Sequence, residues 1–173
     1  MVPQFTICLA NGSAMGHGLA LVLCCDYALA LEGAFFSLSD VKFGLVPAAL
    51  APYLLAKAGT GVSKRLFCTA ESVSAAKAVE LGILDEAVPS LEEARRLVRG
   101  LCERLACCGP RSVEAAKELV LGVAGQQIVE PLMFYTSMMA QRAATSEEAQ
   151  AAAQATRLAQ PKPWEEHPVV APA

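Results

Sequence analysis

Charged residues are scarce in this sequence: they make up 18% of its 173 residues, against 54% hydrophobic residues. There is no run of lysines and arginines, and the formal net charge is −3. Because nucleic acids and anionic membranes attract basic surfaces, we expect no nucleic-acid partner and no membrane-surface partner. The apolar composition and the length indicate an ordered domain with a core of its own.

Long hydrophobic runs are also absent. The longest, Gly18–Cys25, is stopped by Asp26, whereas a membrane-spanning helix needs about 20 apolar residues. The first residues, Met1–Phe5, lack the basic and apolar regions of a signal peptide. We therefore expect a soluble protein with no membrane span.

Metal-binding patterns are missing as well. No C-x-x-C pair occurs, and only His17 and His167 are available to complete a mixed zinc site. The seven cysteines are odd in number and lie mostly in apolar segments, which is not typical of a disulfide framework. We predict buried, reduced thiols in a reducing compartment, cytoplasm or organelle matrix, and no metal or redox cofactor.

The first forty residues show an α/β pattern. Three short apolar runs, Phe5–Ala10, Tyr27–Leu31 and Phe35–Leu38, predict strands. The apolar stretch Leu19–Cys25 predicts a helix that is packed on all sides. Strand, helix, strand and strand in this order indicate an α/β fold with a thin sheet.

From Pro47 onward the signals are helical. A helix from Ala48 is expected to end at Gly59, and Ser90 with Glu93 forms a capping-box pattern that opens another helix. The other expected elements are helices at 63–69, 74–81, 112–121 and 128–154, an extended piece at 86–88, and a loose proline-rich tail.

The segment Asn11–Gly18, NGSAMGHG, joins an expected strand to an expected helix. Backbone N–H groups at a helix start are unpaired and carry the positive end of the helix dipole. A thioester carbonyl placed there would have its developing oxyanion stabilised. A packed glycine turn without any ligand explains the same pattern, and the sequence leaves both interpretations open.

Other chemistries fit this segment poorly. Ser13 lies one place too early for the G-x-S-x-G pattern of a hydrolase nucleophile. The third glycine of a dinucleotide-binding pattern is missing after Gly16 and Gly18. A hydrolase that uses Ser13 therefore remains only a weak alternative.

Two further residues are candidates for proton transfer. His17 is either a general base or a residue that contributes only its backbone N–H. Asp40 follows an expected strand in an apolar neighbourhood that includes Phe43, Leu45 and Val46. Such surroundings favour a protonated acid that can serve in catalysis, although a turn or helix-cap aspartate is an equal alternative.

Three longer stretches carry motifs in a fixed order. Asn11–Asp26 resembles N-G-x-A-x-G-G-G followed by an apolar helix that ends in C-D, with His17 at the middle glycine. Phe36–Pro47 resembles F-x-x-P-E-x-x-x-G-L-x-P, with Ser39-Asp40 at the P-E positions, and Ala75–Val88 is similar to A-x-x-A-x-x-x-G-L-V-x-x-V. In order and spacing these stretches resemble the crotonase (enoyl-CoA hydratase/isomerase) superfamily.

The resemblance implies a fold and a partition of the chain. The implied fold is α/β: a truncated crotonase-like ββα spiral, its amino-terminal part missing, followed by a helical carboxy-terminal region. We expect the spiral core at residues 1–110, a helical trimerisation region at 111–160 and a loose tail at 161–173. An acyl-CoA thioester is the implied substrate, with coenzyme A as part of it and no other cofactor. A homo- or hetero-oligomer, trimer or hexamer, is the implied assembly.

Site residues follow from the resemblance position by position. The backbone N–H of the family's oxyanion hole falls on His17, and the first catalytic glutamate falls on Ala20, which cannot move a proton. The second glutamate falls on Asp40, which keeps a carboxylic acid. The same resemblance implies that Met15, Gly16, Gly18, Ala20 and Pro47 line the substrate site.

The positions that depart from the family pattern narrow the range of functions that the resemblance implies. Ser39-Asp40 and the stretch Pro47–Pro52 are more similar to methylglutaconyl-CoA-type hydratases and to dehydratases of polyketide β-branching. The basic pair that helps to hold a neighbouring subunit's coenzyme A falls on Ala159 and Gln160. Two hypotheses remain: a lyase or isomerase with Asp40 as its single acid/base, or an inactive, truncated subunit that assembles with full-length paralogues.

Overall fold

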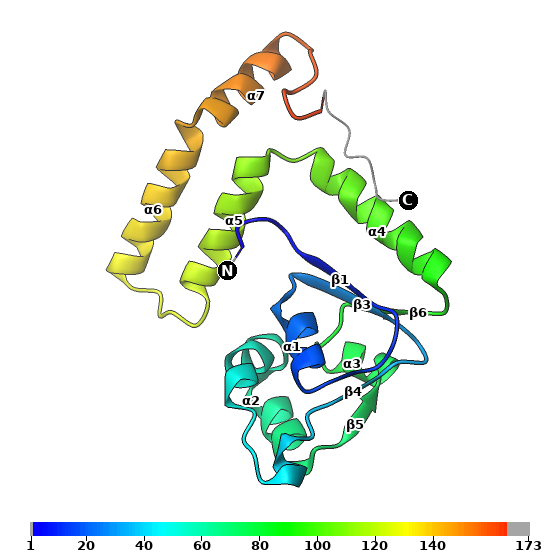
Figure 1. Ribbon diagram of the computed structural model, residues 1–173. Coiled ribbons are helices and arrows are strands. Elements are labelled where there is room, and N and C mark those ends of the chain that lie inside the picture. The colour runs from blue at the N-terminus through cyan, green and yellow to red at the C-terminus, as the bar shows by residue number, and fades with distance from the viewer. Residues whose placement is uncertain (1, 166–173) are drawn as a thin grey trace. The chain divides into compact units, whose positions relative to one another are not determined.

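The computed structural model describes residues 2–165, which form two compact units (Figure 1). One unit comprises Thr6–Val98 and holds both sheets. The other comprises the residues before Thr6 together with the chain from Arg99 onward, and it is helical. In residues 2–165, no helix combines the length and the apolar character that a membrane crossing requires.

The first sheet is parallel and has the strand order β1-β3-β6. Its strands are β1 (Ile7–Ala10), β3 (Tyr27–Leu31) and β6 (Glu86–Val88). The helix α1 (His17–Cys24) connects β1 to β3. The strands expected at the first two apolar runs and the helix between them are therefore confirmed.

The sequence did not predict the second small sheet that the structure contains. It contains β2 (Ala14–Met15), β4 (Phe35–Ser37) and β5 (Ser72–Ser74), in the order β2-β4-β5. The single thin sheet expected from the sequence is thus wrong in one respect, because β4 leaves the first sheet. The turn after β3, closed by the Ala34 N–H to Leu31 O bond of 2.9 Å, redirects the chain.

The rest of this unit is helical and covers the core. Two short 3₁₀ helices, η1 (Asp40–Phe43) and η2 (Ala48–Leu50), precede α2 (Ala51–Thr69). Gly59, at φ 73°, kinks α2 where the sequence predicted a helix end. The helix α3 (Ala75–Glu80) is capped by Ser74, and its side chains join a core that includes Leu19, Phe36, Leu38, Leu54 and Ile83.

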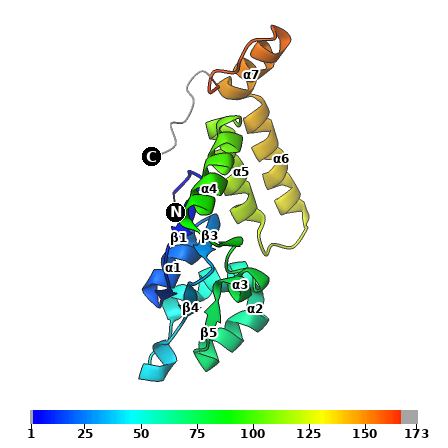
Figure 2. The ribbon, with the colours of Figure 1, turned by 90° about the vertical axis from the view of Figure 1, so that its right-hand side faces the viewer.

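The helical unit begins within α4 (Leu91–Ala106) and continues with α5 (Pro110–Val123), α6 (Glu130–Ala144) and α7 (Glu147–Arg157). The helices α5 and α6 lie side by side in both views (Figures 1 and 2). Half of the expected capping box forms: Ser90 Oγ accepts from Glu93 N–H at 3.1 Å, while the Glu93 carboxylate bonds Arg96 instead.

The single long helix expected at 128–154 is wrong. The chain breaks at Thr145 and Ser146, and Ser146 Oγ accepts from Ala149 N–H at 3.2 Å as the cap of a new helix. Serine favours helix N-caps because its hydroxyl satisfies an unpaired N–H of the first turn. This cap signal was not recognised in the sequence, because the alanines that follow Ser146 are strong helix formers and favour one continuous helix.

The expected tail lies partly outside the described residues. In its described part, the Trp164 indole N–H donates to Cys107 O at 3.2 Å, and Lys162 lies 5.9 Å from the centre of the same ring. The cysteines are free, as expected, but the expected burial is wrong. Four are exposed and three are half-buried, because the apolar segments that hold them have one face on the surface.

Candidate functional site

The turn between β2 and α1 presents backbone donors. Gly16 caps α1 at φ 50° and ψ −118°, and its N–H donates to Ser37 O at 3.1 Å. Glycine adopts this backbone region readily and other residues do not. Throughout residues 2–165, no acceptor binds the backbone N–H groups of His17 and Gly18. These first-turn donors lie at the positive end of the helix dipole and suit an anionic oxygen.

The side chains around this turn are small or turned outward. Met15, at the end of β2, is 57% exposed. His17 is exposed, and in the described part of the chain its imidazole takes part in no hydrogen bond. A side chain at Gly18 would contact only the Ala14 Cβ, at an ordinary 3.7 Å. Ala20 is half-buried and packs against the core. The backbone, not a side chain, is therefore what this turn offers to a ligand.

Ser13 has a structural partner. Its hydroxyl accepts the Phe35 N–H at 2.9 Å and so fixes the start of β4 next to β2. No histidine bonds Ser13 within the described residues. This contact gives Ser13 a positioning role and lends no support to the hydrolase alternative.

Asp40 is tied to the donor turn through the backbone. Met15 pairs with Ser37 in the β2–β4 register, and the Gly16 bond to Ser37 O continues this pairing. Asp40 then begins η1, three residues after Ser37. Asp40 is half-buried, and the cap position of η1 is held by Ser39, whose side chain makes no capping bond. A helix-cap role for Asp40 therefore finds no support in the described residues.

The apolar enclosure expected around Asp40 is not present. Phe43 is 75% exposed, Leu45 61% and Val46 80%. They are exposed because η1 and the residues after it run along the surface, where Gly44 at φ 72° closes the turn with its N–H on Asp40 O and Val41 O. By contrast, Pro47 is buried at the start of η2. An apolar surface thus lies beside Asp40 without covering it.

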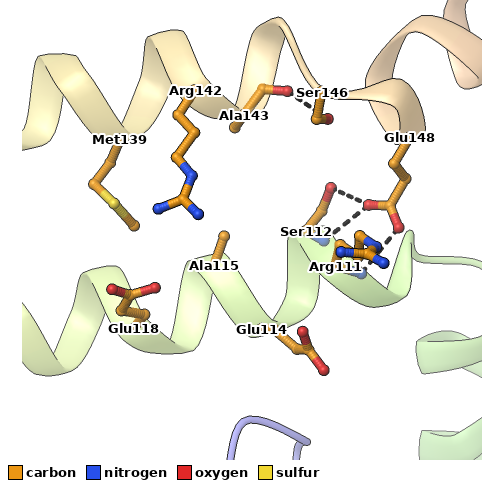
Figure 3. Close-up of a pocket in the computed structure, with 10 residues that line it drawn as sticks. All are labelled: Arg111, Ser112, Glu114, Ala115, Glu118, Met139, Arg142, Ala143, Ser146 and Glu148. Carbon is orange, nitrogen blue, oxygen red and sulfur yellow. Dashed lines mark hydrogen bonds between the residues drawn. The ribbon is translucent and has the colours of Figure 1, made fainter.

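A separate cavity lies within the helical unit. It has a volume of about 240 Å³ and is lined by residues of α5, α6 and the start of α7 (Figure 3). Glu148 on its wall accepts Arg111 N–H at 2.9 Å, Ser112 N–H at 2.8 Å and Ser112 Oγ–H at 2.7 Å. No motif in the sequence indicated these residues as a site, although Ser146 followed by two glutamates is a helix-start signal.

Glu148 therefore caps α5 from outside that helix. Partial burial raises the pKa of Glu148, but the bonds from the Ser112 hydroxyl and from the two backbone N–H groups outweigh it, so the pKa lies below its ordinary value. A Cβ at Gly109 would come within 2.5 Å of Glu148 Oε1. Glu148 therefore serves as a structural contact at this helix junction.

No cluster of three or more histidine, cysteine, aspartate or glutamate side chains suited to a metal occurs among residues 2–165. The arrangement that remains is a helix N-terminus with available N–H donors, joined by a short strand pair to one carboxylic acid. These elements define an α/β protein in which a turn with available backbone donors and one carboxylic acid belong to the same unit.

The chain belongs to the enoyl-CoA hydratase/isomerase family, whose model matches residues 1–166. It is 32% identical over 118 residues to an enoyl-CoA hydratase of Alternaria alternata, which covers 68% of this chain. It is 31% identical over 116 residues to the 2,3-dehydroadipyl-CoA hydratase of Escherichia coli, which covers 65% of it. The expected family is therefore confirmed.

Solved structures confirm the expected fold. An enoyl-CoA hydratase from Shewanella pealeana superposes with a TM-score of 0.88 at 33% identity, covering 94% of this chain and 60% of its own. The chain spans 39% of the length of the Alternaria protein and 44% of the E. coli protein. The similarity therefore covers less than two thirds of each relative.

Proposed function

We propose that this chain binds an acyl thioester and stabilises its enolate at the N-terminus of α1, with Asp40 as the only side chain that moves a proton. The observation that carries the proposal is the Gly16 N–H to Ser37 O bond of 3.1 Å. This bond joins the donor turn to the strand that leads into Asp40. The N–H groups of His17 and Gly18, which have no acceptor within residues 2–165, are the proposed oxyanion donors.

The chemistry that one acid supports is double-bond migration or dehydration of an activated substrate. The Asp40 carboxylate takes a proton from the carbon next to the thioester, and the electron pair moves onto the thioester oxygen. The N–H donors hold that oxygen, a contribution of about 10²–10³ in rate per donor. The protonated Asp40 then returns its proton at a different carbon. Ala20 has no group for a second transfer, so hydration by two acids fits less well.

The names of the relatives support the proposed substrate class. The E. coli relative is named for a CoA thioester, and the Alternaria relative is named an enoyl-CoA hydratase. We extend this to an acyl thioester of coenzyme A or of an acyl carrier protein, which is the substrate rather than a resident cofactor. Met15, Gly16, Gly18, Ala20 and Pro47 are the proposed lining of its site.

The test is isomerisation of a 3-enoyl-CoA to the conjugated 2-enoyl-CoA by the purified chain. Asp40→Asn keeps the shape of the side chain but cannot transfer the proton, and we expect it to lower turnover by about 10²–10⁴. Glu32→Gln, at an exposed acid next to β3, is the matched control and is expected to leave the rate unchanged. Equal rates for wild type and Asp40→Asn would remove Asp40 from the mechanism.

An inactive subunit that assembles with fuller paralogues is the second candidate. Ala20 at the position of the first catalytic glutamate favours it. Thioester binding without any isomerisation or proton exchange, together with co-purification with an active paralogue, would support this candidate over the first.

For the partition of the chain we propose a spiral core at 1–110, a trimerisation region at 111–160 and a tail at 161–173. Large apolar side chains stand exposed on α5 and α6, among them Val120 at 64% and Phe134 at 67%. Exposed apolar surface of this kind marks association sites. It supports an oligomer built through these helices.

A further inference from the structure

The strand β1 forms an outer edge of the parallel sheet. Within residues 2–165, only β3 pairs with it. Tyr27 N–H donates to Thr6 O at 3.1 Å, and Ile7 lies opposite Tyr27 in the register. In a parallel ladder, every second residue of a strand bonds a given neighbouring strand. The N–H and C=O groups of Ile7 and Leu9 therefore face away from β3, toward the open edge.

The bonds of β3 support this alternation. Ala28 N–H donates to Asp85 Oδ2 at 2.7 Å, and Ala28 O accepts Asp85 N–H at 2.8 Å, so Ala28 faces β6 and not β1. Neither Ile7 nor Leu9 makes a backbone hydrogen bond outside the ladder in the described part of the chain. The edge of β1 thus presents backbone donors and acceptors that a further strand can pair.

The edge of β1 lacks the features that usually protect an outer strand. Proteins guard such edges with charged side chains and prolines, because an unpaired edge is a template for another strand. The opposite edge of this sheet, β6, carries Glu86 and is followed by Pro89. The sequence of β1 is Ile-Cys-Leu-Ala, with neither a charge nor a proline.

Both faces of β1 pack against apolar side chains. Ile7 and Leu9 pack against the core cluster that contains Leu29, and Cys8 and Ala10 pack against the larger core cluster on the other face. A strand that extends this sheet must continue both apolar layers, so it must be apolar on both of its faces. The strand β1 of a second copy meets this requirement and brings no charge to repel its partner.

We propose that two copies of this chain associate by pairing their β1 strands in an antiparallel ladder. Ile7 of each copy lies opposite the partner's Leu9, because only this register pairs every outward N–H and C=O group of both strands. Cys8 then lies opposite the partner's Cys8 at a non-hydrogen-bonded position, where Cα atoms are about 4.5 Å apart. This separation lies within the range of about 4.4–6.8 Å that a disulfide spans.

The pairing of β1 strands is distinct from the association proposed on α5 and α6. It involves the unit Thr6–Val98 alone. It also does not depend on the proposed catalytic function, since no residue of the donor turn takes part.

A disulfide between the two copies of Cys8 reports the proposed register. The full chain is treated with diamide, which takes up the two hydrogen atoms of two thiols, and free thiols are then blocked with N-ethylmaleimide. Chymotrypsin cuts after Phe5 and Leu9 and releases the fragment Thr6–Leu9. Because each chain yields this fragment once, two such fragments joined by a disulfide come from two chains. Mass spectrometry should detect this joined pair in the wild type, and it should be lost in Cys8→Ser.

Leu9→Pro tests the hydrogen bonds of the edge. Proline removes the outward N–H of position 9 but leaves the bonds between β1 and β3 in place, since edge strands accept proline on their open side. Leu9→Ala is the matched control, because it removes the same side chain and keeps the N–H. We expect the joined pair of fragments in Leu9→Ala and its loss in Leu9→Pro, with circular dichroism showing that both variants are folded. Equal yields in the two folded variants would show that the edge does not mediate the association.

Hydrogen exchange of the Leu9 amide in the wild type decides the matter if Leu9→Pro does not fold. The proposal predicts slow exchange together with the joined pair. Slow exchange without the joined pair would mean that a different strand covers the edge. Fast exchange at concentrations at which the protein sediments as an oligomer would mean that the edge stays unpaired. Either of these two results overturns the proposal.

Discussion

At the scale of single residues, the geometry of the donor turn depends on Gly16. Its φ of 50° with ψ of −118° lies where side chains are strained, although a Cβ would meet no atom within 4 Å. We therefore expect Gly16→Ala to destabilise the fold by about 1–3 kcal/mol, through backbone strain rather than a clash. Urea denaturation measures the loss.

Gly12→Ala is the matched control, because a Cβ at Gly12 also meets no atom within 4 Å and its φ is not in the left-handed region. We expect that variant to be neutral within about 0.5 kcal/mol. If both alanine variants had the same stability, the strain assigned to Gly16 would be wrong.

The sequence indicated the glycine-rich turn and Asp40 as candidate site residues, because few residue types suit the roles proposed for them. The exposure of the apolar residues around Asp40 could not be predicted in the same way. Phe43, Leu45 and Val46 are apolar, but the sequence does not reveal that η1 runs along the surface and leaves them exposed.

At the scale of elements, we expect the junction between α5 and α7 to make the stability of the fold depend on pH. Glu148 has a folded-state pKa below its ordinary value of 4.5 because hydrogen bonds from the start of α5 outweigh partial burial. A depressed pKa means that the carboxylate stabilises the fold above about pH 4.5, and that this stability is lost as the pH falls through the folded-state value.

We expect Glu148→Ala to lower the stability at pH 7 by about 1 kcal/mol, as loss of a helix cap does. The difference from wild type should shrink below pH 4.5, where the carboxyl loses its charge. Glu147→Ala removes the neighbouring acid from the same first turn of α7 and serves as control. Thermal melts across the pH range make the comparison, and a gap that stays constant with pH would refute the cap.

The ends of the helices and strands show where local sequence signals are sufficient to predict an element boundary. Gly59 kinks α2 where a helix end was predicted, and Gly82 follows the region in which the helix predicted at 74–81 ends, because a positive φ interrupts the helical hydrogen bonds. The break at Ser146 was missed because strong helix formers surround it. The strands β2 and β5 were missed because strands of two and three residues carry too little periodicity to detect.

At the scale of the whole molecule, we expect association. Sedimentation should show species larger than the 18.1 kDa chain. Phe134, 67% exposed on α6, is the proposed contact, so Phe134→Asp should shift the population toward the monomer. Gln141→Asp adds the same charge on the same helix and should not. A wild type that is monomeric at all concentrations would contradict the proposed trimerisation region.

The family and the fold class could be predicted from three motifs because their order and spacing are specific. The activity could not, because Ala20 and Asp40 together depart from the two-glutamate pattern and permit more than one reaction. The sequence gives no signal for the division between the two units at Val98, because α4 continues through this position without a break.

Proton exchange at the carbon next to the thioester reports directly on enolate formation at the donor turn. An acyl-CoA incubated with the protein in D₂O should gain deuterium at the carbon next to the thioester, because the proposed mechanism needs only the α1 donors and Asp40 to form the enolate and reprotonate it. Mass spectrometry of the acyl-CoA measures the exchange. We expect exchange by the wild type and by His17→Gly, none by Asp40→Asn, and no appreciable hydration of crotonyl-CoA. Exchange that persists in Asp40→Asn, or robust hydration of crotonyl-CoA by the wild type, would refute the proposed mechanism.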